Sequence, residues 1–363
     1  MPHLKTFYRK LLALLACFSL SGTILFFSQV TSLPWKPLEF SPESTLHSMD
    51  LFDLIYVVSL ANRLSRRDDM EKLRHALRLN WQYHDALPAN DDLVLRISNS
   101  VSQIRLQHGY GIPQHQAPSA FAWPDDIDKL AKSRKELDLW SSDFHELLFQ
   151  EPPRLPYPPL TCARNNFDIT SYSSLLREHF ILTPPRIACW HSHLTAIQKI
   201  ANNNSDRPGV ALILEDDVDM EVDIVSQLSQ LWPTLPADWD IVFVGHCWSD
   251  ESLGRPLTPV EDTFSASRLF HSTRPKCTHA YALSRVGARR LLLHLRYPLF
   301  AYSRAIDQAF AWLVESGRLK GFSVVPSLII QRKVASSDVL IGGVGSKWKD
   351  SLRNGVFDGQ PLT

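Results

Sequence analysis

The stretch at residues 210–218, Val-Ala-Leu-Ile-Leu-Glu-Asp-Asp-Val, constrains the fold most, because an apolar run passes directly into three adjacent carboxylates. A short continuous apolar run is typical of a strand that is buried on both faces, as in parallel sheets covered by helices. In open α/β sheets, ligands bind beyond the carboxyl ends of such strands. Hard divalent cations prefer oxygen ligands. Glu215, Asp216 and Asp217 therefore predict a cation site at a sheet edge, beside a phosphorylated ligand.

Apolar strand-like runs alternate with helical patterns along the rest of the chain. Further strands are expected at 51–60, 81–87, 240–246, 279–283 and 322–330. From the spacing of their apolar residues, helices are expected at 68–79, 184–200, 224–232, 284–295 and 304–314. The alternation predicts an α/β fold with a mostly parallel sheet flanked by helices. Residues 109–161 interrupt it with proline-rich sequence and one amphipathic pattern near 127–149, so this stretch is expected to be an insertion.

The N-terminal sequence predicts a membrane anchor. Lys5, Arg9 and Lys10 precede residues 11–30, an uncharged apolar run that is long enough to span a bilayer core. A cleaved signal peptide has a shorter apolar region of roughly 7–15 residues, so an uncleaved signal anchor is favoured over cleavage. Basic residues before the span keep the N-terminus in the cytoplasm and send the remainder across the membrane.

The expected organisation is a single-pass type II membrane protein of the Golgi or endoplasmic reticulum, with its bulk in the lumen. Residues 1–10 form the cytoplasmic tail, 11–30 the transmembrane helix, 31–49 a stem rich in proline and serine, 50–345 the main domain and 346–363 a loose tail. This organisation places the main domain in an oxidising compartment.

The cysteines and the balanced charge fit a lumenal domain without a nucleic-acid partner. Lys plus Arg and Asp plus Glu both total 38, so the chain lacks the basic excess of a nucleic-acid binder. Disulfides are favoured over a zinc site for Cys162, Cys189, Cys247 and Cys277, because no C-x-x-C spacing occurs. Their pairing stays open. Asn203 begins an N-x-S sequon in a polar turn that would tolerate a glycan.

Two further groups are candidates for chemistry. Arg63, Arg66 and Arg67 follow the first strand and suit the binding of a phosphate or nucleotide, although the same pattern fits a solvated helix start. Asp307 interrupts the apolar face of its helix, where burial would raise its pKa as a general base requires. The alternative for Asp307 is a helix-face carboxylate paired with Arg304.

The acidic cluster also has a structural alternative, since strands often end in an acid at a turn or at a helix cap. Three adjacent acids, followed by Asp219, Glu221 and Asp223, favour a cation that balances their mutual repulsion. The functional interpretation is therefore preferred for this cluster.

Three other motifs fit a functional role less well. His191 and His193 point to different sides of a helix, so His193 is expected to be a hydrogen-bonded core residue. The glycine-rich stretch 342–347 lacks the spacing of a phosphate loop. Cys247 occupies the nucleophile position of a hydrolase-like turn, but the second glycine of that turn is missing and a disulfide would remove the thiol.

As an ordered set, these motifs resemble glycosyltransferase family 25, which includes bacterial lipooligosaccharide galactosyltransferases and procollagen galactosyltransferases, and within it the fungal branch. The resemblance spans about residues 51–338, apart from 109–161. It rests on Ile-Tyr-Val-Val-Ser-Leu with the arginines after it, Ala-Cys-Trp-His-Ser-His at 188–193, Leu-Ile-Leu-Glu-Asp-Asp-Val at 212–218, Cys-Thr-His-Ala-Tyr-Ala-Leu-Ser at 277–284, and Asp307.

The resemblance implies a GT-A type nucleotide-diphospho-sugar transferase fold, Mn²⁺ or Mg²⁺, and inversion at the anomeric carbon. It implies a nucleoside-diphosphate sugar donor such as UDP-galactose. By position, Glu215 and Asp217 are expected to bind the metal and Asp307 to act near the acceptor, although the motif reads Glu-Asp-Asp rather than Asp-x-Asp and leaves the metal pair open. Four residues are expected to contact the donor: Ser59, Arg63, Arg67 and Asp216.

The predicted function is therefore that of a hexosyltransferase, which moves a sugar from this donor to a hydroxyl of a glycan or glycoprotein acceptor. One alternative is a non-catalytic lumenal glycan-binding or scaffold protein on the same fold. The other is a thiol hydrolase with Cys247 as nucleophile.

Overall fold

The computed structural model describes residues 51–110, 122–150, 156–164, 167–204, 209–247, 251, 254–257, 267–332 and 352–357. Within these ranges, no helix combines the length and the apolar character that crossing a membrane requires. The expected cytoplasmic tail at 1–10, transmembrane helix at 11–30 and stem at 31–49 lie outside the described residues, as does the glycine-rich stretch 342–347.

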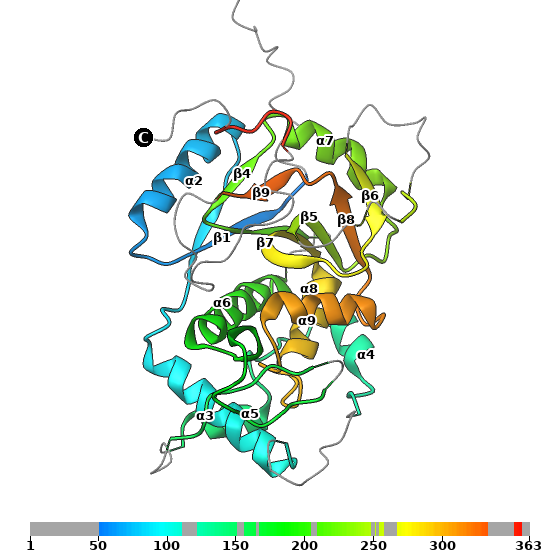
Figure 1. Ribbon diagram of the computed structural model, residues 1–363. Helices are drawn as coiled ribbons and strands as arrows, with labels where there is room; N and C mark the ends of the chain where they lie inside the picture. The colour runs from blue at the N-terminus through cyan, green and yellow to red at the C-terminus, as the bar shows by residue number, and fades with distance from the viewer. Residues whose placement is uncertain are drawn as a thin grey trace, which may run out of the picture. The chain divides into compact units, whose positions relative to one another are not determined.

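A mixed sheet forms the centre of the fold, with strands in the order β2-β1-β3-β7-β5-β8-β6 (Figure 1). Its strands are β1 (Leu54–Ser59), β2 (Gln82–Asp85), β3 (Val210–Glu215), β5 (Ile241–Cys247), β6 (Arg268–His271), β7 (Lys276–Ser284) and β8 (Gly321–Val325). β1 pairs in parallel with β2 and β3, and β5 with β8, whereas β7 is antiparallel to β3 and β5, and β6 to β8. Five of the seven strands therefore share one direction, which confirms the predicted mostly parallel α/β sheet.

Helices cover both faces of this sheet (Figure 1). One face packs against α2 (Leu64–Leu77) and α7 (Ile224–Leu231), and the other against α6 (Pro184–Ala201), α8 (Arg285–Leu295) and α9 (Ile306–Glu315). Beyond α6 and α8 lie α3 (Asp92–Gln107), α4 (Ile127–Lys132) and α5 (Ser142–Leu148). A separate two-stranded ribbon consists of β4 (Val218–Met220) and β9 (Ile329–Gln331). Two short 3₁₀ helices occupy Glu178–Phe180 and Trp232–Thr234.

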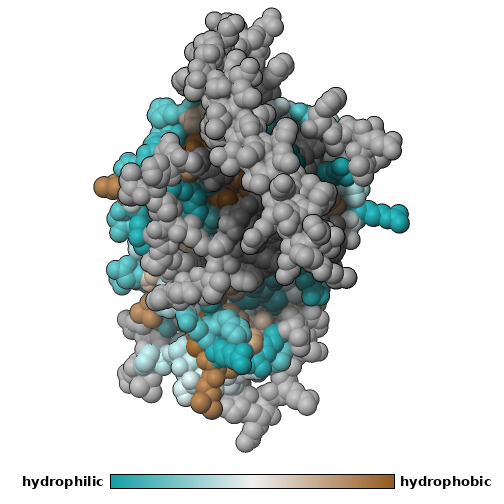
Figure 2. Space-filling model, turned by 45° about the horizontal axis from the view of Figure 1, so that its top comes forward, coloured by the Kyte–Doolittle hydropathy of each residue, from teal (hydrophilic) through white to brown (hydrophobic). Residues whose placement is uncertain are grey.

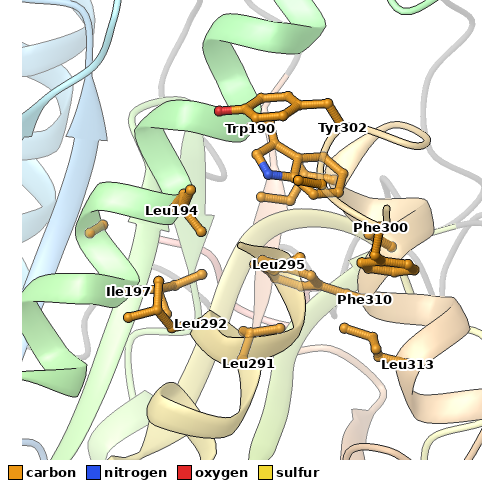
Figure 3. Close-up of a cluster of buried hydrophobic side chains, with 14 of the residues drawn as sticks. Trp190, Leu194, Ile197, Leu291, Leu292, Leu295, Phe300, Tyr302, Phe310 and Leu313 are labelled. Atoms are coloured by element: carbon orange, nitrogen blue, oxygen red, sulfur yellow. The ribbon is translucent and has the colours of Figure 1, made fainter. Parts of the chain in front are cut away.

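Alternate side chains of the strands enter two different hydrophobic cores. In β1, Tyr56 and Val58 join the core on the α6 side, whereas Ile55 and Val57 join the core on the α2 side. Both faces are thus apolar, which explains why the strands read as continuous apolar runs. Figure 3 shows the core on the α6 side, where large side chains of α6, α8 and α9 meet those of the segment before α9.

The region around the expected insertion differs from the prediction. α3 was not expected, and α4 and α5 replace the single helix expected near 127–149. The chain between them bonds to the end of α6 instead of continuing as a helix. The Leu137 N–H donates to Asn202 Oδ1 (2.9 Å), and the Leu137 carbonyl accepts from Asn202 Nδ2 (2.9 Å).

α8 begins at a close contact with the start of β5. Ser284 is the N-cap of this helix, and its Oγ accepts the Gly287 N–H at 2.9 Å. A Cβ atom at Gly287 would lie 2.0 Å from the Asp240 carbonyl oxygen. Only glycine therefore fits at this crossing.

Acids that follow the cluster at 215–217 have structural partners. Asp219 and Glu221 are buried and accept backbone N–H groups of residues 353–357. Asp223 Oδ1 accepts a hydrogen bond from Gln227 Nε2 (2.8 Å). Within the stretch expected to be a loose tail, residues 353–357 are thus bound to β4 and the turn after it, and these acids do not add to a cation site.

The described surface is mostly hydrophilic in Figure 2, and its apolar patches are small and separate. The most exposed large apolar side chains, Leu64, Leu95, Phe149 and Leu175, come from different parts of the fold. This view therefore shows no broad apolar surface among the described residues.

Candidate functional site

The carboxyl ends of the parallel strands bring polar residues to one edge of the sheet. Ser59 ends β1, Asp85 ends β2 and Glu215 ends β3. β5 ends at the same edge with Cys247, where its antiparallel neighbour β7 begins with Lys276. This is the edge at which open α/β sheets bind ligands, and it is where the sequence predicts the acidic cluster.

Asp216 joins β1 to α2 at this edge. Ser59 Oγ donates to Asp216 Oδ2 at 2.7 Å, and Arg66 Nη1 donates to Asp216 Oδ1 at 2.9 Å. The residue is 7% exposed. Since both of its carboxylate oxygens have protein partners, Asp216 fixes Ser59 and Arg66 at the mouth of the site.

Asp217 has one satisfied and one unsatisfied oxygen. Its Oδ2 accepts from Arg66 Nη1 (3.3 Å) and Gln331 Nε2 (3.1 Å). Its Oδ1 is buried and has no hydrogen-bond partner within the described part of the chain. Burial, followed by the negative charge of Glu215, raises the pKa of Asp217 from its ordinary value of 3.8 to about 7, although Arg66 acts in the opposite direction.

Glu215 points to the opposite side, toward α6 and β7. Its Oε1 accepts from Thr278 Oγ1 at 2.6 Å and lies 3.5 Å from His193 Nε2. Burial acts to raise the pKa of Glu215, but the hydrogen bond and charge of His193, with Thr278 and His279, outweigh it and lower the pKa to about 2. His193 is buried and its Nδ1 lies 2.9 Å from Tyr281 Oη, as expected for a hydrogen-bonded core histidine, yet it also contacts the acidic cluster.

The arginines of the expected basic loop lie at the start of α2. Arg67 donates to Ser59 from Nε (3.2 Å to Oγ) and Nη2 (3.1 Å to the carbonyl), and to Asp85 Oδ1 (2.5 Å). Arg66 bridges the two aspartates of the cluster. Arg63 is half-buried at the N-cap position of the helix. The structure thus brings together three of the predicted donor contacts, Ser59, Arg67 and Asp216. The fourth, Arg63, lies one helical turn before Arg67.

Asp307 lies in the first turn of α9 and faces the start of β7. Its Oδ2 accepts the Cys277 N–H (3.4 Å), and its Oδ1 accepts the Gln308 N–H (2.8 Å). The next residue of β7, Thr278, donates to Glu215 Oε1. Asp307 and Glu215 are therefore both held by the start of β7, and the role of Asp307 as a base stays a prediction.

Arg304, the partner of Asp307 in the structural alternative, packs against aromatic rings. Its guanidinium carbon lies 5.5 Å from the ring centroids of both Phe300 and Trp312. Burial lowers the pKa of Arg304 to about 10. This arginine contributes to the aromatic core beneath α9.

The acidic cluster fits a divalent cation by charge and by donor type. Arg66 supplies one positive charge to two aspartates, and Asp217 Oδ1 is left without a hydrogen-bond donor among the described residues. The two carboxylates predicted to bind metal have different partners: Glu215 contacts Thr278 and His193, whereas Asp217 contacts Arg66 and Gln331. Among the described residues, the carboxylates at 215–217 do not bring three ligand atoms within 4.8 Å of one another. Carboxylate oxygens are the ligands that Mg²⁺ and Mn²⁺ prefer.

A disulfide joins Cys247 to Cys277, which confirms the expected disulfides for two of the four cysteines and not for the other two. Cys162 and Cys189 are free. The two bonded sulfurs lie near a ring nitrogen of His279, but a disulfide offers no thiolate to a metal. The thiol-hydrolase alternative is wrong for this structure, because Cys247 is fully buried and has no free thiol.

Some residues of the site were not predicted from the sequence. Thr278 lies inside the stretch 277–284 that carries the resemblance, but a single threonine at a strand start has no distinctive pattern. Gln331 lies more than 100 positions from Asp217 in the chain, and only the pairing of β9 with β4 brings the two together. No local sequence signal could have identified it.

A cavity of about 400 Å³ lies apart from this site, among α3, α4, α5 and α8. Its lining includes His108, Asp126, Arg296 and Tyr297 and none of the residues that surround the acidic cluster. It is therefore not part of the candidate site.

Comparison with protein families gives one match. The model for glycosyltransferase family 25 (LPS biosynthesis protein) matches residues 52–301. That range contains the first strand, the arginines of α2, the acidic cluster and the start of β7, whereas Asp307 and Gln331 lie after it. No curated protein matches the chain.

Proposed function

The chain belongs to glycosyltransferase family 25, and from this premise we propose that it transfers a hexose from a nucleoside-diphosphate sugar to a hydroxyl of a glycan or glycoprotein. The proposed donor is UDP-galactose, and the proposed fold is of the GT-A type. The mixed sheet, with carboxylates and arginines at the carboxyl ends of its parallel strands, supports the fold and a phosphorylated donor.

The observation that carries this proposal is the buried Oδ1 of Asp217, which no described residue hydrogen-bonds, beside the two other carboxylates of the cluster. We assign the metal to Asp217 and Glu215, and Mn²⁺ or Mg²⁺ as the ion. When bound, the cation would neutralise charge that develops on the departing diphosphate. Asp216 keeps Arg66 in place, so that a guanidinium also faces this position.

The donor nucleotide is assigned to the side of the site formed by β1 and α2. Arg67 is fixed by Ser59 and Asp85, and Arg63 lies one turn earlier in the chain, so both are placed to contact phosphate or ribose oxygens. Fixed guanidinium groups bind phosphate with directional hydrogen bonds, which favours a single orientation of the donor.

The acceptor is assigned to the side formed by β7 and α9. In a single displacement, the acceptor hydroxyl oxygen attacks the anomeric carbon as the bond to the diphosphate breaks, and the configuration inverts. Asp307 takes the hydroxyl proton, and the Cys277 and Gln308 N–H groups orient its carboxylate at the start of α9. Glu215 contacts β7 as well, through Thr278.

We also propose that the protein is a single-pass type II membrane protein of the Golgi or endoplasmic reticulum, anchored by residues 11–30. The uncharged length of this segment and the basic residues before it support this location. The disulfide between Cys247 and Cys277 suits an oxidising lumen.

A panel of nucleotide sugars tests the proposed function. The detergent-solubilised full chain would be incubated with each donor and Mn²⁺, and binding would be measured before hydrolysis and transfer. We expect binding and slow hydrolysis for one UDP-hexose. A lumenal scaffold protein would hydrolyse none of the donors, and that result would contradict the proposal.

A further inference from the structure

We propose that the disulfide between Cys247 and Cys277 is a positioning bond of the transfer site, and that its reduction slows sugar transfer by releasing the start of β7. The effect on transfer rests on the proposed function. The effect on the structure does not, because it concerns backbone contacts that can be measured without a substrate.

Three consecutive residues at the start of β7 each contact the acceptor side of the site. Lys276 Nζ donates to Gln308 Oε1, next to Asp307. The Cys277 N–H donates to Asp307 Oδ2 at 3.4 Å. Thr278 Oγ1 donates to Glu215 Oε1 at 2.6 Å. Residues 276–278 therefore set the positions of Asp307 and Glu215 relative to each other.

The disulfide holds these residues at the last paired position of two strands. Cys247 is the final residue of β5 and pairs with Lys276, after register shifts at Phe243/Gly245 and Gly245/Cys247. The strand pairing between β5 and β7 is thus irregular at the start of β7, and this is the end of β7 that contacts Asp307 and Glu215. The disulfide supplies a covalent link at this point, with a Cα–Cα distance of 5.7 Å.

The backbone of Cys277 supports the same conclusion. Its φ angle is +70°, in the left-handed region that non-glycine residues rarely adopt. Such a conformation persists only where the surrounding structure enforces it. Cys277 also donates its N–H to Asp307, and the disulfide restrains Cys277 covalently in this conformation.

The two halves of the site depend on this bond to different degrees. The donor side is held by hydrogen bonds among Ser59, Arg66, Arg67 and Asp216, none of which involves β7. The acceptor side is held by residues 276–278. Loss of the disulfide should therefore reduce kcat more than it weakens donor binding: the nucleotide contacts at β1 and α2 remain, and only Glu215, an assigned metal ligand, also contacts β7.

The chemistry of the switch is ordinary thiol–disulfide exchange. A dithiol reductant supplies two electrons and two protons, the S–S bond breaks to give two thiols, and the dithiol closes to its own disulfide. Cys247 is fully buried, whereas Cys277 is half-buried, so the reductant is expected to attack at Cys277.

The test uses the full chain in detergent, with and without dithiothreitol, together with a Cys247→Ala/Cys277→Ala double variant. Reduction of the wild type is expected to lower kcat by about tenfold and to change the KM for the donor by a smaller factor, the pattern that follows when a positioned catalytic group loses its hydrogen bonds. The double variant should have the low kcat and should not respond to dithiothreitol. A Cys162→Ser variant, which lacks a free buried cysteine instead, should respond to the reductant as the wild type does.

Hydrogen exchange supplies a readout that is independent of transfer. Reduction should speed exchange of the amides at 276–278 while the amides of β1 and α2 remain protected. The inference is overturned if mass spectrometry shows the bond reduced and both kcat and this exchange stay unchanged, or if exchange rises throughout the domain, which would indicate a general stabilising role. Absence of transfer in every form would count against the proposed function, and the exchange result would still decide this inference.

Discussion

At the scale of single residues, Asp217 and Glu215 lie two positions apart, yet their surroundings give their carboxyl groups opposite properties. Burial and the charge of Glu215 raise the pKa of Asp217 to about 7. For Glu215, burial is outweighed by His193 and Thr278, and the pKa falls to about 2. Near neutral pH, Glu215 is therefore charged, while Asp217 exchanges a proton that a cation would displace.

The first prediction concerns the pH dependence of cation binding. Because Mn²⁺ must displace the proton of Asp217, its apparent affinity should fall by about tenfold for each pH unit below about 7 and level off above that value. Between pH 4 and 7 the folded state holds a proton on Asp217 that the unfolded chain has lost, so this group's contribution to stability decreases as pH rises through that window. Calorimetric titration with Mn²⁺ at several pH values checks the affinity, and Asp217→Asn should lose the pH dependence.

A second prediction concerns Arg66, which bridges Asp216 and Asp217 with its side chain 18% exposed. Arg66→Gln should reduce the free energy of unfolding by about 1–3 kcal/mol without metal, because two partly buried carboxylates lose their counter-charge. Mn²⁺ should restore more stability to this variant than to the wild type. Arg74→Gln, which breaks the more exposed pair with Glu71 on the same helix, is the matched control and should cost less than about 1 kcal/mol. Equal losses in both variants, with no extra rescue by Mn²⁺, would be evidence against the role of Arg66.

The residue types of the site could be predicted better than their partners. Adjacent acids after an apolar run, and arginines after the first strand, are local patterns that point to a cation and a phosphate. The partners that determine their chemistry are distant in the chain. His193 and Thr278 reach Glu215 from α6 and β7, and Gln331 reaches Asp217 from β9. The pKa values of Glu215 and Asp217 therefore could not be predicted without the tertiary structure.

At the scale of helices and strands, close contacts between elements determine where the site residues lie. α8 crosses the start of β5 at Gly287, and β7 leads directly into this helix. The position of β7 therefore depends on how closely α8 can approach. The other end of β7 carries the contacts to Glu215 and Asp307.

The third prediction is that Gly287→Ala lowers the free energy of unfolding by about 1–3 kcal/mol, because the new methyl group overlaps the Asp240 carbonyl. Thermal and urea unfolding measure the loss. Val286→Ala, at an exposed position of the same helix, should change stability by less than about 0.5 kcal/mol. Equal stability of the two variants would show that the close contact between Gly287 and the Asp240 carbonyl does not contribute to the stability of the domain.

Elements with strong periodicity could be predicted, and elements defined by pairing could not. The apolar runs of β1, β3 and β5 and the helical spacing of α6 and α8 are local signals, and the structure contains all five. β4, β6 and β9 have three or four residues each and depend on their partners for stability. The expected late strand at 322–330 is divided at Pro326 into β8 and β9, since proline cannot donate a ladder hydrogen bond.

At the scale of the whole molecule, the C-terminal residues 353–357 complete the fold. Their backbone N–H groups satisfy Asp219 and Glu221, and the ring of Phe357 lies 3.7 Å from the guanidinium carbon of Arg332. Without these residues, two buried carboxylates next to the acidic cluster would lose hydrogen-bond donors. This role could not be predicted, because the polar sequence at the end of the chain resembles an ordinary loose tail.

The fourth prediction follows from these contacts. Deletion of residues 352–363 should lower the free energy of unfolding by about 1–3 kcal/mol for each carboxylate left without its donors. The control deletion removes only residues 358–363 and keeps every one of these contacts. Thermal unfolding of the two deletions distinguishes them, and equal melting temperatures would show that residues 353–357 do not stabilise the domain.

The central claim is that the carboxylates at the end of β3 hold a cation that sugar transfer requires. The most direct test compares the wild type with Asp217→Asn in donor hydrolysis and sugar transfer, with Mn²⁺ and with a chelator, alongside thermal unfolding. Asp217→Asn should abolish both activities without lowering the melting temperature, because it removes a carboxylate whose pKa is raised by burial and by the charge of Glu215. Wild-type activity in this variant in the presence of chelator would contradict the claim.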